Sequence, residues 1–155
     1  MPLAMCAPCI QFKKCSVATF KKPAAKAAMD CARACAWGGG TIINAIATGH
    51  GAAFPISLRV MAEVCRSDRL EVATYADVDV EPIRKVVQMV AERWGVGPVA
   101  IKITGDLPPA GGLKSSSAVV NALVSATAKL AGANVDLFDV ARINAQLSRE
   151  VGISV

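Results

Sequence analysis

The sequence is short of the residues that build aromatic surfaces and histidine-rich metal sites. Its 155 residues include one histidine, two tryptophans, one tyrosine and four phenylalanines, although 54% of them are hydrophobic. A single histidine disfavours a zinc site with histidine ligands. Few aromatics disfavour a nucleic-acid surface with interleaved stacking residues. The hydrophobic fraction is too high for a disordered chain, and its small apolar side chains fit closely packed helices and sheet.

Acidic residues are nearly absent from the first 36 positions, where Asp30 stands alone among five lysines and one arginine. Basic and acidic side chains are equal in number over the remaining residues, so the net charge of +5 belongs to the N-terminal segment. This distribution argues against a nucleic-acid partner for the rest of the chain. We interpret residues 1–35 as an atypical basic extension rich in cysteine, alanine and lysine, poorly ordered and with some helix around 24–35. Residues 36–155 are interpreted as the folded domain.

No charged residue occurs from Ala36 to Leu58. The length of this run would suffice for a membrane span. Its many glycines, Asn44 and Pro55 make it a poor one, so we expect no membrane association.

Five of the six cysteines fall in the first 36 residues. Cys6 and Cys9 form a C-x-x-C pair, Cys31 and Cys35 are four apart, and Cys65 follows much later. A zinc site would need a second tight pair or a nearby histidine. A disulfide framework would need more cysteines in the core and a secretory signal. We therefore expect reduced thiols in a cytoplasmic protein.

The most informative stretch joins a strand-like run to a helix-like run. It comprises Pro108, Pro109, Ala110, Gly111, Gly112, Leu113, Lys114, Ser115, Ser116, Ser117 and Ala118. Adjacent glycines permit positive φ and close approach of the backbone to a ligand. The serines stand where a helix would begin, and a helix N-terminus offers unpaired N–H groups and a positive dipole end to a phosphate. Lys114 would add a full positive charge.

Spacing alone leaves two interpretations of this stretch open, a phosphate-binding loop and a flexible turn capped by serine. It is not the P-loop signature, because no Gly-Lys-Ser/Thr follows a four-residue spacer. The glycine spacing also differs from that of the dinucleotide-binding fingerprint.

A second glycine-rich segment runs from Gly38 to Gly40, after a short strand expected at 33–37. We expect these glycines to break the strand and residues 41–48 to form a loop or a short helical turn. Thr41, Asn44 and Thr48 would then supply neutral hydrogen bonds to substrate hydroxyls. The alternative is a tight strand–helix turn in which the same polar residues act as caps.

Periodicity and turn chemistry predict the remaining elements. Strands at 52–66 and 70–74 are expected to form a β-hairpin around a turn at 67–69. The other expected elements are a helix capped by Asp79 and stopped by Gly95, a strand at 98–104, a helix from Ser115 or Ser116 to Gly132, and a helix capped by Asp136. The stripe expected on that last helix contains residues 137, 140, 141, 144, 147 and 151. This order of elements indicates an α+β fold.

The pattern Pro-x-x-x-Gly-Leu-x-Ser-Ser-x-Ala, from Pro108 to Ala118, resembles the second motif of the GHMP kinase superfamily (galacto-, homoserine, mevalonate and phosphomevalonate kinases). Lys114, where most members have glycine, and the upstream segment 39–49 resemble the archaeal-type shikimate kinases. The resemblance covers about residues 36–155. It implies the N-terminal half of the GHMP kinase fold, similar to domain 2 of ribosomal protein S5, with the C-terminal ferredoxin-like domain absent.

The resemblance also implies a reaction. The γ-phosphate of ATP would pass to a hydroxyl of shikimate, giving shikimate 3-phosphate in aromatic amino acid biosynthesis, with ATP and Mg²⁺ as cofactors. The loop would wrap the triphosphate, Lys114 would pair with phosphate, and a serine, foremost Ser116, would reach Mg²⁺. In the family the upstream segment, here 39–49, is the first motif and lies in the substrate and nucleotide cleft. This position favours substrate contact for Thr41, Asn44 and Thr48.

The catalytic acidic residues of the family are expected beyond Val155, together with a third motif. We therefore expect a fragment with weak or no turnover by itself, whose open apolar surface favours self-association. Two alternatives remain, a related kinase acting on homoserine or a mevalonate-type alcohol, and a non-catalytic nucleotide-binding remnant.

Overall fold

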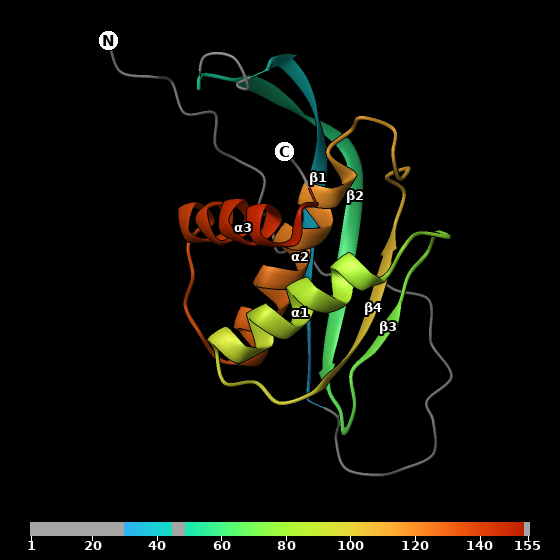
Figure 1. Cartoon of the computed structure of the whole chain (residues 1–155), viewed down its shortest axis with the longest axis vertical. Helices are drawn as coiled ribbons and strands as arrows, with labels where there is room; N and C mark the ends of the chain where they lie inside the picture. Colours follow the sequence, from blue (N-terminus) through green and yellow to red (C-terminus); the bar gives the residue numbers. More distant parts are fainter. Residues whose placement is uncertain (1–29, 45–48, 154–155) are drawn as a thin grey trace.

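The computed structural model describes residues 30–44 and 49–153 as a sheet covered on one face by helices (Figure 1). The strands are β1 (Cys31–Ile43), β2 (Ala52–Arg66), β3 (Glu71–Ala73) and β4 (Val99–Gly105). The helices are α1 (Glu81–Arg93), α2 (Ser115–Leu130) and α3 (Leu137–Val151). The α+β class predicted from the sequence is confirmed. Within the described ranges, none of the helices is both long and apolar enough to cross a bilayer.

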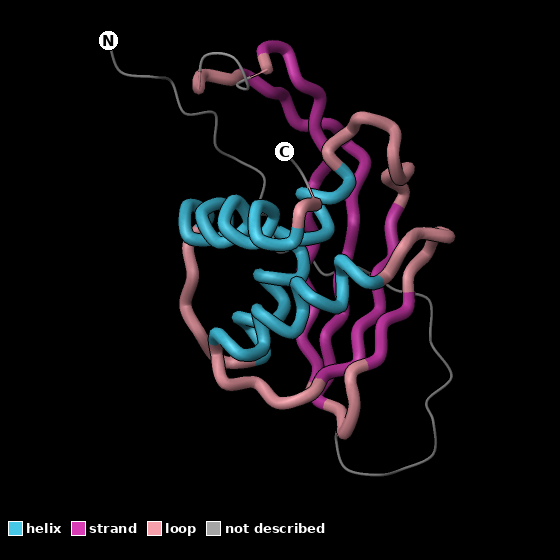
Figure 2. The backbone as a smooth tube through the Cα atoms, viewed as in Figure 1, coloured by secondary structure: helices cyan, strands magenta, loops and turns pink. Residues whose placement is uncertain are grey.

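The sheet has the order β1-β2-β4-β3 (Figure 2). β2 pairs antiparallel with β1 on one side and with β4 on the other, whereas β3 pairs parallel with β4. The predicted hairpin between β2 and β3 is therefore wrong, because β4 lies between these two strands. The turn residues at 67–69 predict that the chain changes direction, but they do not predict which strand pairs with β2 in the sheet.

β1 is longer than the sequence predicts at both of its ends. It already begins at Cys31, so residues 31–35 belong to the sheet and the helix expected around 24–35 is wrong for them. It also runs through Gly38–Gly40 to Ile43, where a break and a loop were expected. Gly39 and Gly40 stand opposite Pro55 and Phe54 of β2, with shifts of register after Trp37 and after Thr41. The other part of the proposed extension, residues 1–29, lies outside the described residues.

Alternating side chains of β2 and β4 build the core, as their period predicts. Val60, Ala62, Val64, Val99, Ile101 and Ile103 are all buried beneath the helices. Each helix adds an apolar stripe, for example Val86, Val87 and Val90 of α1. On α3 the stripe is rotated from the prediction, because residues 137 and 141 are exposed and residues 143 and 148 are buried.

The predicted helix ends are confirmed with one shift. Asp136 accepts a hydrogen bond from the Asp139 N–H at 2.8 Å and caps α3. Asp79 accepts from the Glu81 N–H at 3.0 Å, although the residue at the cap position of α1 is Val80. Gly95 and Gly132, with φ of 62° and 70°, follow α1 and α2, where a left-handed residue ends a helix at little cost.

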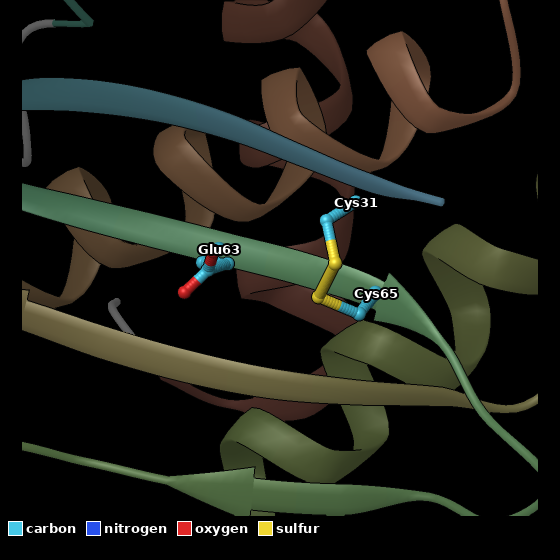
Figure 3. Close-up of side chains that lie close together, drawn as sticks. All are labelled: Cys31, Glu63 and Cys65. Carbon is cyan, nitrogen blue, oxygen red and sulfur yellow. A yellow bond between two sulfur atoms is a disulfide. The ribbon is translucent and has the colours of Figure 1, made fainter. Parts of the chain in front are cut away.

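Cys31 and Cys65 form a disulfide between β1 and β2, on the sheet face away from the helices (Figure 3). The expectation of reduced thiols is wrong for this pair, because the register places the two cysteines directly opposite each other. Glu63 lies beside them and accepts a hydrogen bond from Arg33 Nε at 2.7 Å. Both sulfurs are held in a covalent bond, so this group offers a cation only the Glu63 carboxylate.

β1 allows an unusually close approach by the segment that follows β4. A Cβ atom on Gly38 would lie 2.5 Å from Leu107 Cδ1 and 3.0 Å from the Leu113 carbonyl oxygen. The Gly39 N–H donates to that same Leu113 oxygen at 3.0 Å. The two glycine-rich motifs, about seventy residues apart in sequence, are therefore in direct contact.

Reduction of the disulfide is expected to lower the free energy of unfolding by about 3–4 kcal/mol, because the bond closes a loop of 34 residues in the unfolded chain. Urea unfolding with and without reductant measures this difference. Cys65→Ser should behave like the reduced protein, whereas Cys35→Ser, at the exposed free cysteine of the described ranges, should not. Equal stability of wild type and Cys65→Ser would contradict a stabilising role of the disulfide.

Gly38→Ala is expected to destabilise the fold by about 1–3 kcal/mol, because the added methyl overlaps Leu107. Gly97→Ala is the matched control, since its Cβ would meet nothing within 4 Å. That substitution should be neutral or slightly stabilising, because it restricts the unfolded chain. Urea unfolding of both variants compares them, and equal effects would show that the close approach at Gly38 is not tight.

Candidate functional site

The segment from Asp106 to Lys114 is neither helix nor strand, and it carries the chain from β4 to the first residue of α2. It lies at the N-terminal end of α2, beside β1 (Figure 1). Ser115, Ser116 and Ser117 form the first turn of α2, as predicted. The sequence motif from Pro108 to Ala118 is thus a loop followed by a helix start.

The main-chain N–H groups of this region have few partners. Among the described residues, no main-chain acceptor is found for the amides from Gly111 to Ser117. The first amide of the helix that is paired belongs to Ala118, which donates to the Lys114 carbonyl at 3.0 Å. Unpaired amides at a helix start, together with the positive end of its dipole, form a site for an anion.

Three residues of the loop, at alternate positions, have a left-handed backbone. Ala110, Gly112 and Lys114 have φ of 57°, 70° and 56°, whereas Gly111 and Leu113 lie outside the left-handed region. Successive N–H groups in a turn conformation can form a concavity that binds an anion. The sequence suggested positive φ at the two glycines only. Ala110 and Lys114 were missed because non-glycine residues rarely adopt this conformation, at a cost of about 1 kcal/mol or more.

Lys114 is the residue at the cap position of α2, and its side chain is exposed. Its Cδ lies 3.6 Å from where a Cβ on Gly39 would stand, so its aliphatic stem runs over the glycines of β1. The lysine stem is therefore in van der Waals reach of the main chain of Gly39. The lysine charge lies at the same end of α2 as the unpaired amides.

The proposed substrate residues lie further along β1. Thr41 is exposed and pairs with Ala53 of β2. It stands two residues beyond Gly39, which in a strand is about 7 Å. Asn44 is exposed just after the strand, and Thr48 lies outside the described residues. The strand thus carries Thr41 past the loop, and the geometry does not assign it a ligand.

A cavity of about 320 Å³ opens beside the first turn of α2. Its walls come from the segment between β3 and α1, from α1 and α2, and from the residues after α3. The lining residues are Thr74, Tyr75, Ala76, Val78, Asp79, Pro82, Ile83, Val86, Ile103, Pro109, Ser115, Ser116, Val119, Val120, Leu123, Gly152 and Ile153. Apart from the loop residues, none of these was singled out as a site residue, because an apolar wall has the same sequence pattern as a core. The unpaired amides and an apolar cavity therefore adjoin at Ser115 and Ser116.

Tyr75 connects the cavity wall to the loop. Its hydroxyl donates a hydrogen bond to the Leu107 carbonyl. Burial, and in second place the negative charge of Asp106, raise the pKa of Tyr75 above its usual value. The hydroxyl therefore stays protonated and remains a donor to Leu107 well into the alkaline range.

Residues 81–155 match the family described as GHMP kinases N terminal domain. The chain is 40% identical over 128 residues to a shikimate kinase of Methanosarcina acetivorans, an alignment that covers 79% of this chain and 44% of the relative. It is 41% identical over 122 residues to a shikimate kinase of Methanocella arvoryzae, covering 77% of this chain and 42% of that protein. The chain thus spans less than half the length of the curated relatives it matches.

Solved structures agree with this relationship in their fold. The mevalonate kinase of Methanococcus jannaschii superimposes with a TM-score of 0.67 at 12% identity, covering 79% of this chain and 47% of that one. The Streptococcus pneumoniae phosphomevalonate kinase in complex with phosphomevalonate and AMPPNP gives a TM-score of 0.66 at 18% identity, covering 77% and 43%. The architecture predicted from the resemblance, the N-terminal half of the GHMP kinase fold, is confirmed. By motif, by sequence relatives and by fold, the chain belongs to the GHMP kinase superfamily and carries its N-terminal domain.

Proposed function

We propose that this chain supplies the nucleotide-binding half of a small-molecule kinase that transfers the γ-phosphoryl group of ATP to a hydroxyl of shikimate. The observation that carries the proposal is the run of unpaired amides from Gly111 to Ser117, at a helix start beside an apolar cavity. The shikimate kinases of Methanosarcina acetivorans and Methanocella arvoryzae, at about 40% identity, support shikimate as the acceptor.

The arrangement suits the two ends of ATP. The adenine base would enter the apolar cavity between α1 and α2, and the triphosphate would lie over the first turn of α2. Loop amides would donate to phosphate oxygens, and Lys114 would add a charge-assisted hydrogen bond. Kinases work mainly by holding the reactants in line and neutralising charge on the transferred group. This half of the protein would perform that task for the nucleotide.

Mg²⁺ would neutralise charge on the phosphates when it is bound with ATP. Ser116 is exposed at the start of α2, so its hydroxyl is free to face the phosphate side of the site. A hydroxyl oxygen is a ligand type that Mg²⁺ accepts, and Mg²⁺ usually keeps several waters beside one or two protein ligands. Ser116 is our proposed protein ligand from this half, and Thr41, Asn44 and Thr48 remain our proposed contacts to the acceptor.

Lys114→Ala is expected to weaken ATP binding about 10- to 100-fold, because it removes a charged donor from the phosphates. Adenosine, which has no phosphate, should bind the variant as it binds wild type. Isothermal titration calorimetry measures the affinity of the variant and of wild type for ATP and for adenosine. Lys85→Ala, at an exposed lysine of α1, is the matched control and should change neither affinity. Equal ATP affinity of Lys114→Ala and wild type would remove the lysine from the site.

The acceptor is tested with γ-labelled ATP and a panel of shikimate, homoserine and mevalonate. We expect the 155-residue chain to bind ATP but to transfer phosphate weakly or not at all, because the matched region covers only 44% of the first relative, a shikimate kinase. Any label that is transferred should appear on shikimate. Transfer to mevalonate or homoserine instead would favour the related kinases, and tight ATP binding without any transfer in a full-length version would favour a binding remnant.

A further inference from the structure

A buried polar cluster joins the middle of α3 to the first turn of α2. Asn144 of α3 is only 9% exposed and Ser148, one turn on, only 5%. The Asn144 amide nitrogen donates to Asn121 Oδ1 at 2.7 Å and to the Ser117 main-chain oxygen at 3.1 Å. Ser148 Oγ donates to Asn144 Oδ1 at 2.8 Å. Both amide hydrogens and the amide oxygen of Asn144 are thus engaged.

These contacts fix which way the Asn144 amide faces. The Ser117 carbonyl can only accept, so the nitrogen and not the oxygen of Asn144 must point toward α2. A leucine would fill a similar volume and avoid the cost of burying an amide. A fully paired polar group in such an interface fixes orientation between its elements.

The bond to Ser117 reaches the loop through one rigid unit. The Ser117 carbonyl and the Ala118 N–H belong to the same planar peptide group. On its other side this peptide donates from Ala118 to the Lys114 carbonyl at 3.0 Å. Asn144 therefore fixes the peptide whose N–H donates to the Lys114 carbonyl. That hydrogen bond closes the turn that contains the unpaired amides of Ser115, Ser116 and Ser117.

We propose that Asn144 is a positioning residue, which holds the first turn of α2 so that its free amides and Lys114 converge on a phosphate group. The inference rests on the nucleotide site proposed above and assigns the orientation of its phosphate half to a side chain from α3. The apolar half of the same site is lined by Gly152 and Ile153, which follow α3. A general loosening of α3 would therefore weaken binding at both halves, whereas loss of the Ser117 contact alone would weaken only the phosphate half.

The test is the binding of two probes to the full chain by isothermal titration calorimetry, inorganic tripolyphosphate for the phosphate half and adenosine for the apolar half. Asn144→Leu is expected to weaken tripolyphosphate about 5- to 10-fold, the loss expected for one hydrogen bond of ordinary strength, and to leave adenosine unchanged. Thr127→Val is the matched control. It removes a buried hydroxyl from α2, whose bond to the Leu123 carbonyl lies about two to three turns from the loop, and both affinities should stay at the wild-type values.

Three results would overturn the positioning role. Unchanged tripolyphosphate binding by Asn144→Leu overturns it while leaving the nucleotide site standing. An equal fall for both probes also overturns it, because that is the result of a loosened α3. Absence of tripolyphosphate binding by wild type overturns the nucleotide site and the inference with it. Circular dichroism checks folding, and Asn144→Ser, smaller and still polar, replaces the leucine variant under the same criteria if that variant does not fold.

Discussion

The close approach between β1 and the loop that follows β4 is the constraint on which the site depends. Gly38 leaves room for the fully buried Leu107, and Gly39 donates to the Leu113 carbonyl at 3.0 Å. A side chain at Gly38 would push the loop away from the sheet. The loop then could not run back along β1 and turn into α2 with Lys114 above Gly39. The glycines in the middle of β1 thus allow two distant motifs to come together.

Several elements contact the loop, whereas its amides from Gly111 to Lys114 have no main-chain acceptor among the described residues. β1 contacts it through Gly39, Tyr75 holds the Leu107 carbonyl, and α3 holds the first turn of α2 through Asn144. The left-handed residues Ala110 and Lys114 cost free energy, and the surrounding contacts compensate for it. In the proposed site, the amides from Gly111 to Ser117 would therefore be preorganised for a ligand. Preorganised donors need no reorganisation when charge arrives, which is how such groups stabilise an anion effectively.

The chain corresponds to about half of the kinases that it resembles in sequence and in fold. Shikimate kinases that share about 40% identity are more than twice as long as the matched region, and solved structures of the superfamily match over less than half of their length. The described residues bring an apolar cavity and a helix start with unpaired amides together at Ser115 and Ser116, and the proposed nucleotide site uses both. Asn144 contacts the first turn of α2 from outside the recognised motif, and we propose that it positions the amides there.

Local chemistry in the sequence was sufficient to place most helices and the loop. Asp136, Gly95 and Gly132 marked helix ends because caps and left-handed glycines act within one turn. Serines after a glycine pair marked the start of α2 for the same reason, and alternation marked the buried faces of β2 and β4. Each of these features depends on neighbours within a few residues.

Only the tertiary structure decided the features that join distant segments. The pairing of β3 with β4, the extension of β1 through Gly38–Gly40 and the Cys31–Cys65 disulfide all follow from strand register, which no local pattern specifies. The apolar cavity and the Asn144 cluster likewise arise where α1, α2 and α3 meet. A glycine, an asparagine or a valine has the same local signature in a loop, a core or a site. Its role is set by which side chains the folded chain brings against it.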